Sequence, residues 1–423
     1  MYPLKVSVFF SQFIHFFKRV IHKAHFHEPP LWLIALVAGL PIFSETMYTP
    51  ALPHIAKALQ VSETWVEYTL SLYFFGTALG TLFWGHFSDY YGRRPALLLG
   101  FACYVGGCFL CLKSTHITML LGARFLQALG GSVGTVLGQA ISHDVFRGRR
   151  RGQVFSVIGS IISLSTAIGP MVGGFLDQVY GWRMIFLVLM LWGFVLVITL
   201  FFKMPETHHI EKRKLPPTWR ILKKMLQDPK VLTCGAIIGG ANGLIFSFNA
   251  EGPFYLINIL GLTPLTYGYC FTAFALTGAL GNYVSKYLHN TFETSKILKH
   301  GIVIMTMGAV MFACITMILW LTGAQKGYYI AFTVISLCII VFGRGLSMAN
   351  CLSLGLEDYV KTAGVATSLF VCFYYILISG FTTVMAVLHN GTLLPMPLYF
   401  FSLTLMLLII SRFTPPAQSS EEN

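Results

Sequence analysis

The sequence predicts an all-α membrane protein with twelve spanning helices in two sets of six. Three observations predict this fold. Hydrophobic residues make up 55% of the 423 positions and charged residues only 11%, apolar runs recur along the whole chain, and one long polar interruption divides them equally. A soluble domain carries about 25% charged residues. This composition therefore favours the lipid bilayer as the solvent.

Each apolar run is close to the roughly 20 residues that a helix needs to cross a bilayer. The polar interruption, residues 203–230, holds eight Lys and Arg residues. We expect an N-terminal bundle at 31–202, a linker at 203–230, a C-terminal bundle at 231–413 and a cytoplasmic tail at 414–423. Residues 1–30 form either an amphipathic surface helix or a disordered tail. The predicted spans are 31–52, 66–88, 95–112, 118–142, 154–178, 184–202, 231–258, 266–288, 297–321, 328–350, 362–388 and 395–412.

Positive charge predicts the orientation of these spans. With the N-terminus in the cytoplasm, 23 of the 29 Lys and Arg residues fall in cytoplasmic segments, four fall outside, and Arg124 and Arg344 lie within spans. Basic residues concentrate in cytoplasmic loops, so both termini are expected in the cytoplasm. The net charge of +13 lies in short connections, which argues against nucleic acid as a partner.

A weak internal repeat supports two halves of like topology. Ala-Leu-Gly at 78–80 recurs at 279–281, and Pro50 in the first span matches Pro253 in the seventh. The offsets are 201 and 203 residues. Two such halves are expected to be related by an axis along the membrane normal.

Residues 85–95 read GHFSDYYGRRP and form a short charged turn between the second and third spans. Gly85 and Gly92 permit close packing and a tight turn. Asp89 is placed to pair with an arginine, and Arg93 and Arg94 anchor the cytoplasmic side. This stretch resembles the loop signature of the major facilitator superfamily. The resemblance implies the major facilitator fold, alternating access, and a latch that holds the two halves in the outward-facing state.

A second stretch, residues 124–131, reads RFLQALGG and resembles the RxxQGxG motif of drug:proton antiporters, with Ala128 at the first motif glycine. An arginine within a span is costly and usually functional. The resemblance links Arg124 to proton coupling. The alternative is that Arg124 only reaches to the outer interface.

A third stretch, residues 167–174, reads AIGPMVGG and resembles the antiporter motif GxxxGPxxGG, with Ser165 at the leading glycine. Gly169 and Pro170 are expected to kink the helix, and Gly173 and Gly174 to allow backbone contact with a partner span. The resemblance makes the motif an exporter marker and a barrier to substrate leak. A packing role is the alternative and does not exclude the first.

Four shorter segments resemble exporters of the bicyclomycin and chloramphenicol resistance type, which implies a bacterial inner membrane location. They are MYTPALP at 47–53, GWRMIF at 181–186, GPF at 252–254 and GLTP at 261–264. This type usually carries Asp directly before Met-Tyr. That position is Thr46 here, and the acid is one residue earlier, at Glu45.

Glu45 and Glu251 are the carboxylates predicted to lie well inside the spans. A buried carboxylate can load and release protons, so these two and Arg124 are the predicted coupling residues, with a structural role as the alternative for each acid. Arg344 pairs with an acid, binds an anionic substrate or reaches the interface near Glu357. The predicted substrate cavity is lined by Tyr48, Tyr73, Gln127, Asn242, Asn249, Arg344, Tyr374 and Tyr375.

No nucleotide-binding loop, nucleophile motif or metal-ligand pattern occurs in the sequence. We therefore expect no enzyme activity, no cofactor and no metal, with the proton gradient as the driving force. The predicted function is a monomeric antiporter that exports drugs or small metabolites. A dedicated exporter of one metabolite, such as a carboxylate siderophore, and a transporter-like sensor that does not transport are the alternatives.

Overall fold

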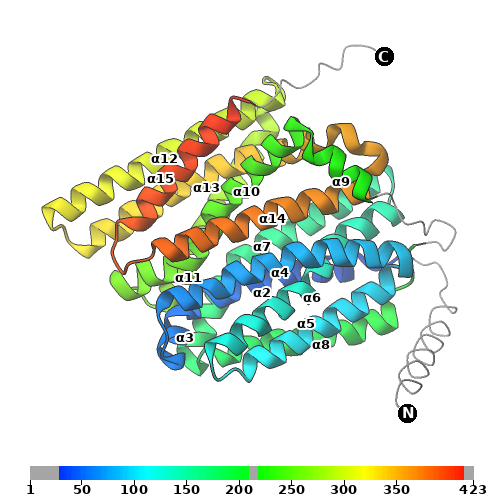
Figure 1. The fold of residues 1–423 in the computed structure, drawn as a ribbon, viewed down its shortest axis with the longest axis horizontal. Helices are drawn as coiled ribbons and strands as arrows, with labels where there is room; N and C mark the ends of the chain where they lie inside the picture. Colours follow the sequence, from blue (N-terminus) through cyan, green and yellow to red (C-terminus); the bar gives the residue numbers. More distant parts are fainter. Residues whose placement is uncertain (1–27, 209–217, 414–423) are drawn as a thin grey trace.

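The computed structural model describes residues 28–208 and 218–413 and is built from long helices that run side by side (Figure 1). Residues 1–27 of the predicted N-terminal tail and the predicted C-terminal tail at 414–423 lie outside the described residues. The N-terminal half contains α2 (Leu31–Tyr48), a 3₁₀ turn (Thr49–Ala51), α3 (Leu52–Leu59), α4 (Glu63–Tyr91), α5 (Arg93–Leu112), α6 (Ile117–Val145), α7 (Gly148–Tyr180) and α8 (Arg183–Lys203).

The C-terminal half repeats this arrangement after one short helix. It contains α9 (Thr218–Leu226), α10 (Pro229–Pro253), a π turn (Phe254–Ile259), α11 (Pro264–Leu288), α12 (Thr294–Thr322), α13 (Lys326–Leu356), a 3₁₀ turn (Glu357–Thr362), α14 (Ala363–Leu388) and α15 (Pro395–Ser411).

Within the described ranges, nine helical segments are long and apolar enough to cross a membrane by length and composition. The shorter apolar α15 and the more polar α4 and α11 complete the predicted twelve. Large apolar side chains remain exposed on the outer faces, among them Phe202 at 78% and Leu321 at 70%. A water-soluble protein seldom tolerates so much exposed apolar surface, so these faces are suited to lipid.

The repeat predicted from Pro50 and Pro253 has a structural counterpart. The first long helix of each half loses regular α geometry at its proline: α2 gives way to the 3₁₀ turn that contains Pro50, and α10 gives way to a π turn directly after Pro253. A proline removes a backbone donor and disturbs the preceding turn. Each half therefore begins with a helix that is interrupted at the same end of the molecule.

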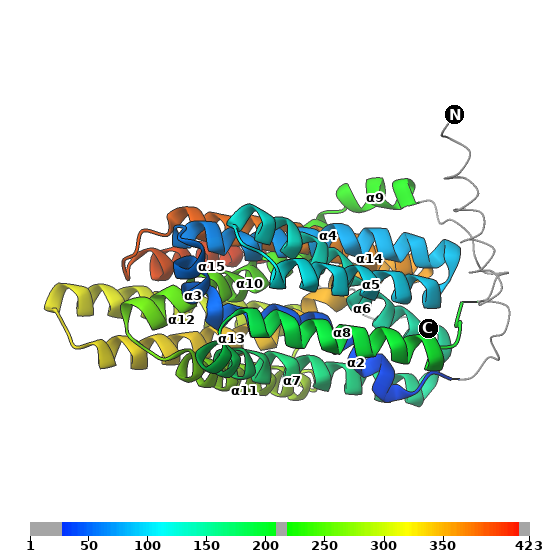
Figure 2. The same cartoon turned by 90° about the horizontal axis from the view of Figure 1, so that it is seen from below.

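Two helix pairs make the most extensive contacts between the halves. Helix α4 packs along α14, and α7 packs along α11 (Figures 1 and 2). Thr272 donates to the carbonyl of Ala167 at 3.2 Å, and Ser379 donates to the carbonyl of Ser71 at 2.8 Å. We call the end of the bundle that carries α3 the α3 end, and the end that carries α9 the α9 end.

Part of the predicted linker is helical. Residues 209–217 lie outside the described residues, but α9 presents Ile221 and Met225 to the protein and leaves Trp219 78% exposed. Two residues after the end of α9, Asp228 caps α10 by accepting from the backbone N–H groups of Lys230 and Val231. A side-chain acceptor at this position stabilises a helix start, which explains why α10 begins inside the predicted linker.

Candidate functional site

Glu45 lies on α2 and is buried, with a relative exposure of 3%. Among the residues that the structure describes, it has no hydrogen-bond or ion-pair partner. It is near enough to Arg124, Tyr73 and Tyr375 for electrostatic interaction. The carboxyl group is thus buried within electrostatic range of a cation, without a direct contact to it.

The neighbouring Thr46 points to a different helix. Its hydroxyl donates to the carbonyl of Ile42 at 3.0 Å and lies 3.3 Å from the carbonyl of Ser165 on α7. A side chain at Gly169 would meet this hydroxyl at 2.0 Å. Position 46 is therefore filled by the contact between α2 and α7, while position 45 is within electrostatic range of other predicted site residues.

Arg124 is fully buried on α6 and lies between two aromatic rings. Its guanidinium carbon is 4.2 Å from the ring centre of Tyr48 and 4.1 Å from that of Tyr73. One guanidinium nitrogen donates to Gln127 Oε1, but Nε and Nη2 have no hydrogen-bond partner among the described residues. The structure therefore does not contain the alternative in which Arg124 only reaches to the outer interface.

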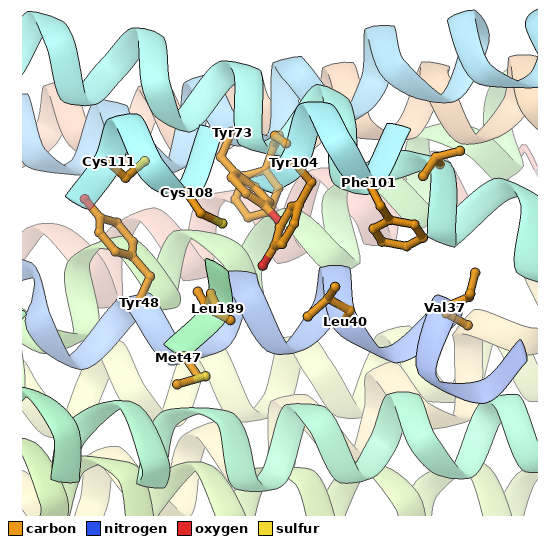
Figure 3. Close-up of a cluster of buried hydrophobic side chains, with 14 of the residues drawn as sticks. Val37, Leu40, Met47, Tyr48, Tyr73, Phe101, Tyr104, Cys108, Cys111 and Leu189 are labelled. Carbon is orange, nitrogen blue, oxygen red and sulfur yellow. The ribbon is translucent and has the colours of Figure 1, made fainter. Parts of the chain in front are cut away.

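Polar side chains from four helices hold this arginine in place. Gln127 Nε2 donates to Ser44 Oγ at 3.1 Å and contacts the Cys108 sulfur at 3.1 Å. The Tyr48 hydroxyl pairs with Thr69 at 2.8 Å. Figure 3 shows Tyr48 rising from α2 toward Cys111 of α5. The arginine is thus fixed by the two rings and by Gln127, and two of its three nitrogens have no hydrogen-bond partner among the described residues.

The C-terminal half reaches this group through α14. Tyr375 is 6% exposed, and its ring lies 6.4 Å from that of Phe74 and 5.0 Å from that of Tyr374. Its proximity to Glu45 brings a side chain of one half to a carboxyl of the other. Six of the predicted residues therefore come together: Glu45, Tyr48, Tyr73, Arg124, Gln127 and Tyr375.

A second group of predicted residues lies within the C-terminal half. Arg344 on α13 donates to Asn242 Oδ1 on α10 at 2.8 Å. Its Nε is buried with no hydrogen-bond partner among the described residues, and the same is true of Asn249 Oδ1. Asn242 and Asn249 are two helical turns apart on α10, so they share one face.

The acids that mark the interface in one alternative for Arg344 bind another cation. Lys230 Nζ lies 2.7 Å from Glu357 and 3.3 Å from Asp358. Within the described ranges Arg344 forms no ion pair. Of the three alternatives for Arg344, the structure contains neither the pairing with an acid nor the approach to Glu357, and the anionic substrate remains a prediction.

The predicted latch residues form a network at the α9 end. Gly92 separates α4 from α5 with a φ of 108°, which favours glycine. Arg93 binds Asp89 at 2.7 Å and Asp144 at 3.0 Å. Glu206 accepts from the backbone N–H groups of Arg93 at 2.9 Å and Arg94 at 3.3 Å, where an anion stabilises the helix start.

These contacts of Arg93 all lie within the N-terminal half, where they tie α4, α5, α6 and the segment after α8 together. The Arg94 guanidinium likewise donates to the carbonyl of Phe201 at 2.7 Å. Gly85 is different, because a side chain there would meet Ser368 of α14 at 3.0 Å. Asp144 and Glu206 were not predicted as members of this network. Their positions after long apolar runs were the only available signal.

The antiporter-like glycines are contact points of α7, which continues through Pro170 without a break. A side chain at Gly173 would meet the Met47 carbonyl oxygen at 2.0 Å, so α2 packs directly on the α7 backbone there. A side chain at Gly174 would meet the Pro264 carbonyl oxygen of the other half at 2.4 Å. One stretch of α7 therefore contacts both the helix of Glu45 and the opposite half.

Glu251 lies away from Glu45, in a separate cluster at the α3 end. His389, directly after α14, lies 2.8 Å from Glu251 through Nδ1 and 2.9 Å from Glu63 through Nε2. Glu67 lies 3.4 Å from the same Nδ1. Glu63, Glu67 and His389 were not predicted from the sequence, although an acid at the start of the predicted span 66–88 was an available signal.

The chain matches known proteins over most of its length. The sequence model of the Major Facilitator Superfamily matches residues 34–383 of this chain. An uncharacterized transporter of Rickettsia felis is 31% identical over 371 residues, which cover 86% of this chain and 91% of the relative. A bicyclomycin resistance protein homolog of Haemophilus influenzae is 28% identical over 343 residues, which cover 79% and 83%.

A solved structure confirms the fold. The xylose transporter XylE from E. coli superposes with a TM-score of 0.71 at 12% identity, over 93% of this chain and 98% of that one. The predicted family and fold are thus confirmed, and the protein is a transporter rather than an enzyme. By its sequence, the chain belongs to the Major Facilitator Superfamily.

Proposed function

We propose that this chain is a proton-coupled antiporter that exports a drug or small metabolite by alternating access. The observation that carries the proposal is the arrangement of Glu45, which is buried without a direct partner and lies near the buried Arg124. The resistance protein of Haemophilus influenzae named above supports a drug as the exported molecule.

The coupling follows from two opposing electrostatic effects on Glu45. Burial away from water disfavours its charged form, whereas the nearby guanidinium of Arg124 favours it. A movement that changes the separation of the two groups therefore changes whether the carboxyl group holds a proton. Tyr375 lies close to Glu45 and belongs to the opposite half, so motion between the halves alters the surroundings of this carboxyl group.

Substrate would bind among the aromatic and amide side chains on both sides of α14. Tyr48, Tyr73 and Gln127 contribute from the N-terminal half, and Arg344 with Asn242 contributes from the C-terminal half. Tyr374 and Tyr375 stand between them. We assign the latch role to the Arg93 network and the leak barrier to the contacts of Gly173 and Gly174.

We assign the coupling to Glu45 rather than to Glu251. Glu251 is held by His389 in the cluster at the α3 end. A Glu251→Gln variant measured beside Glu45→Gln tests this choice. The similarity to a bacterial resistance protein supports an inner membrane location, and the distribution of Lys and Arg supports the α9 end and both termini in the cytoplasm. We take the monomer as the working unit.

A dedicated exporter of an anionic metabolite is the second candidate, and one observation favours it. Arg344 Nε and two nitrogens of Arg124 are buried without hydrogen-bond partners among the described residues. Buried guanidinium N–H groups suit carboxylate oxygens. A carboxylate siderophore is a suitable test compound for this candidate.

The deciding experiment uses inside-out membrane vesicles with an imposed pH gradient. Chloramphenicol, bicyclomycin and a carboxylate siderophore are tested for uptake driven by that gradient. We expect Glu45→Gln to lose gradient-driven uptake while it keeps substrate exchange without a gradient. Glu293→Gln, an exposed acid at the start of α12, is the matched control.

Two results would overturn the proposal. If the gradient moves none of the compounds, the alternative of a sensor that does not transport is favoured. If the Glu45→Gln variant keeps full gradient-driven uptake, the coupling residue is not Glu45.

A further inference from the structure

Three acidic side chains and one histidine meet at the α3 end, and they come from both halves. Glu63 and Glu67 are one helical turn apart at the start of α4, so they share a face. Glu251 is near the end of α10, and His389 directly follows α14. The carboxylates of Glu67 and Glu251 and the imidazole of His389 offer ligand atoms that all lie within 4.8 Å of one another.

Glu67 is the exceptional member of this cluster. Its exposure is 0%, and neither carboxylate oxygen has a hydrogen-bond partner among the described residues. Its nearest cationic atom is His389 Nδ1 at 3.4 Å, which is beyond a good hydrogen bond. A buried carboxylate without such partners costs several kcal/mol. The cluster therefore lacks positive charge at a defined place.

The distances around Nδ1 suit a small metal ion. Ligand atoms about 2.1 Å from a tetrahedral zinc ion are about 3.4 Å apart. The separation of His389 Nδ1 and Glu67 Oε1 is 3.4 Å, and that of Nδ1 and Glu251 Oε2 is 2.8 Å. The first of these two separations equals the tetrahedral edge, and the second has to widen by about 0.6 Å for one ion to contact both atoms. The third edge, between the two carboxylates, is within 4.8 Å.

The other nitrogen of the imidazole is already oriented as in known metal sites. His389 Nε2 lies 2.9 Å from Glu63 Oε2, and Glu63 Oε1 accepts from Asn258. A metal-binding histidine usually donates its second N–H to a carboxylate, which fixes the ring and its tautomer. Glu63 is suited to this positioning role and leaves Nδ1 for the ion.

We infer that Glu67, Glu251 and His389 form a binding site for a divalent transition metal ion such as Zn²⁺, with Glu63 orienting the histidine. Imidazole together with carboxylates favours this class of ion over Mg²⁺, which prefers oxygen ligands in octahedral geometry. Two carboxylates supply the two negative charges that the ion requires. Nδ1 gives up its proton when the ion binds.

The site has a consequence for transport, which rests on the proposed function. Glu67 belongs to the N-terminal half, whereas Glu251 and His389 belong to the C-terminal half. An ion held by all three joins the halves at the α3 end and stabilises the conformation in which that end is closed. In the proposed orientation the α3 end faces outside, so external Zn²⁺ is expected to inhibit the transport cycle.

The test is zinc binding to the purified full-length protein in detergent, after removal of metals with a chelator. We expect Zn²⁺ to bind with a measurable heat and to raise the melting temperature, and Mg²⁺ to do neither. Glu67→Gln, Glu251→Gln and His389→Asn should abolish the shift. Glu63→Gln should weaken binding about 10- to 100-fold, as expected for an orienting carboxylate.

Two matched controls should bind Zn²⁺ like the wild type. They are His116→Asn, an exposed histidine before α6, and Glu293→Gln. If the ligand variants do not fold, Co²⁺ added to the wild type tests the site instead. A Co²⁺ ion held by about four ligands absorbs visible light strongly, and this absorption is lost when Zn²⁺ displaces the ion. Absence of both the melting shift and the Co²⁺ spectrum, or a full shift in Glu67→Gln, would overturn the metal site.

Binding in detergent needs neither a substrate nor a proton gradient. Zinc binding without gradient-driven transport would contradict the exporter proposal alone. Gradient-driven transport without zinc binding would contradict the metal site alone, and would favour a proton shared by the two carboxylates.

Discussion

The contact between α2 and α7 allows a sharp test, because a single methyl group at Gly173 would enter it. The added Cβ would lie 2.0 Å from the Met47 carbonyl oxygen and 2.7 Å from its carbon. Both atoms belong to the backbone, so no side chain can rotate away. Ordinary contact begins near 3.4 Å, and Gly173→Ala must therefore separate the two helices by about 1.4 Å.

The magnitude follows from comparison with a second glycine of the same helix. Gly159 has no heavy atom within 4 Å of its added Cβ. Both substitutions gain about 0.5–1 kcal/mol in helix preference, and only Gly173→Ala carries the cost of overpacking, about 1–3 kcal/mol. The free energies of unfolding of the two variants should therefore differ by about 1–3 kcal/mol, with Gly159→Ala the more stable.

The assay is denaturant unfolding in detergent micelles, followed by tryptophan fluorescence, together with transport in vesicles. Because Met47 is two residues from Glu45, Gly173→Ala should also reduce gradient-driven transport, while Gly159→Ala should retain it. Equal stability of the two variants would refute the close approach of α2 to α7. Normal transport by a destabilised Gly173→Ala would show that the contact serves packing only.

Two further predictions concern charged side chains with different roles. Arg124→Lys keeps the charge but loses the planar group between two rings, which is worth about 2 kcal/mol and should lower the transport rate about 30-fold. The effect is measured as drug resistance at equal membrane expression. A wild-type rate would show that only the charge matters. Glu206→Ala removes the acceptor at the start of α5 and should lower the free energy of unfolding by about 1 kcal/mol, measured by the same unfolding assay, and an unchanged value would mean that the cap contributes nothing.

The features that the sequence predicts correctly depend on local patterns. Apolar runs locate the twelve helices because a bilayer leaves a spanning segment few alternatives to a helix. The motif at residues 85–95 can also be recognised from local sequence, since its glycines and arginines are close together in the chain. The positive φ of Gly92 and the pairing of Arg93 with Asp89 four residues earlier are both short-range features.

The cluster at the α3 end has no local pattern. Glu67, Glu251 and His389 are separated by 184 and 138 positions, and each comes from a different helix or helix end. Glu67 is one polar residue at the start of an apolar run, and His389 follows the end of another. Their meeting depends on how α4, α10 and α14 pack, which is information that no single segment contains.

The place of the acid on α2 is the point where the local sequence and the packing must be read together. Thr46 occupies the position where similar exporters carry Asp, and its hydroxyl lies against α7 within hydrogen-bond distance of the Ser165 carbonyl. A carboxylate in that place would face a carbonyl oxygen and would repel it. One residue earlier is about 100° around the helix, and there Glu45 is within electrostatic range of Arg124 and Tyr375. Under the proposed function, the change from position 46 to position 45 therefore takes the acid off the α7 contact and leaves it within electrostatic range of a side chain of the opposite half, where we propose that motion between the halves acts on it.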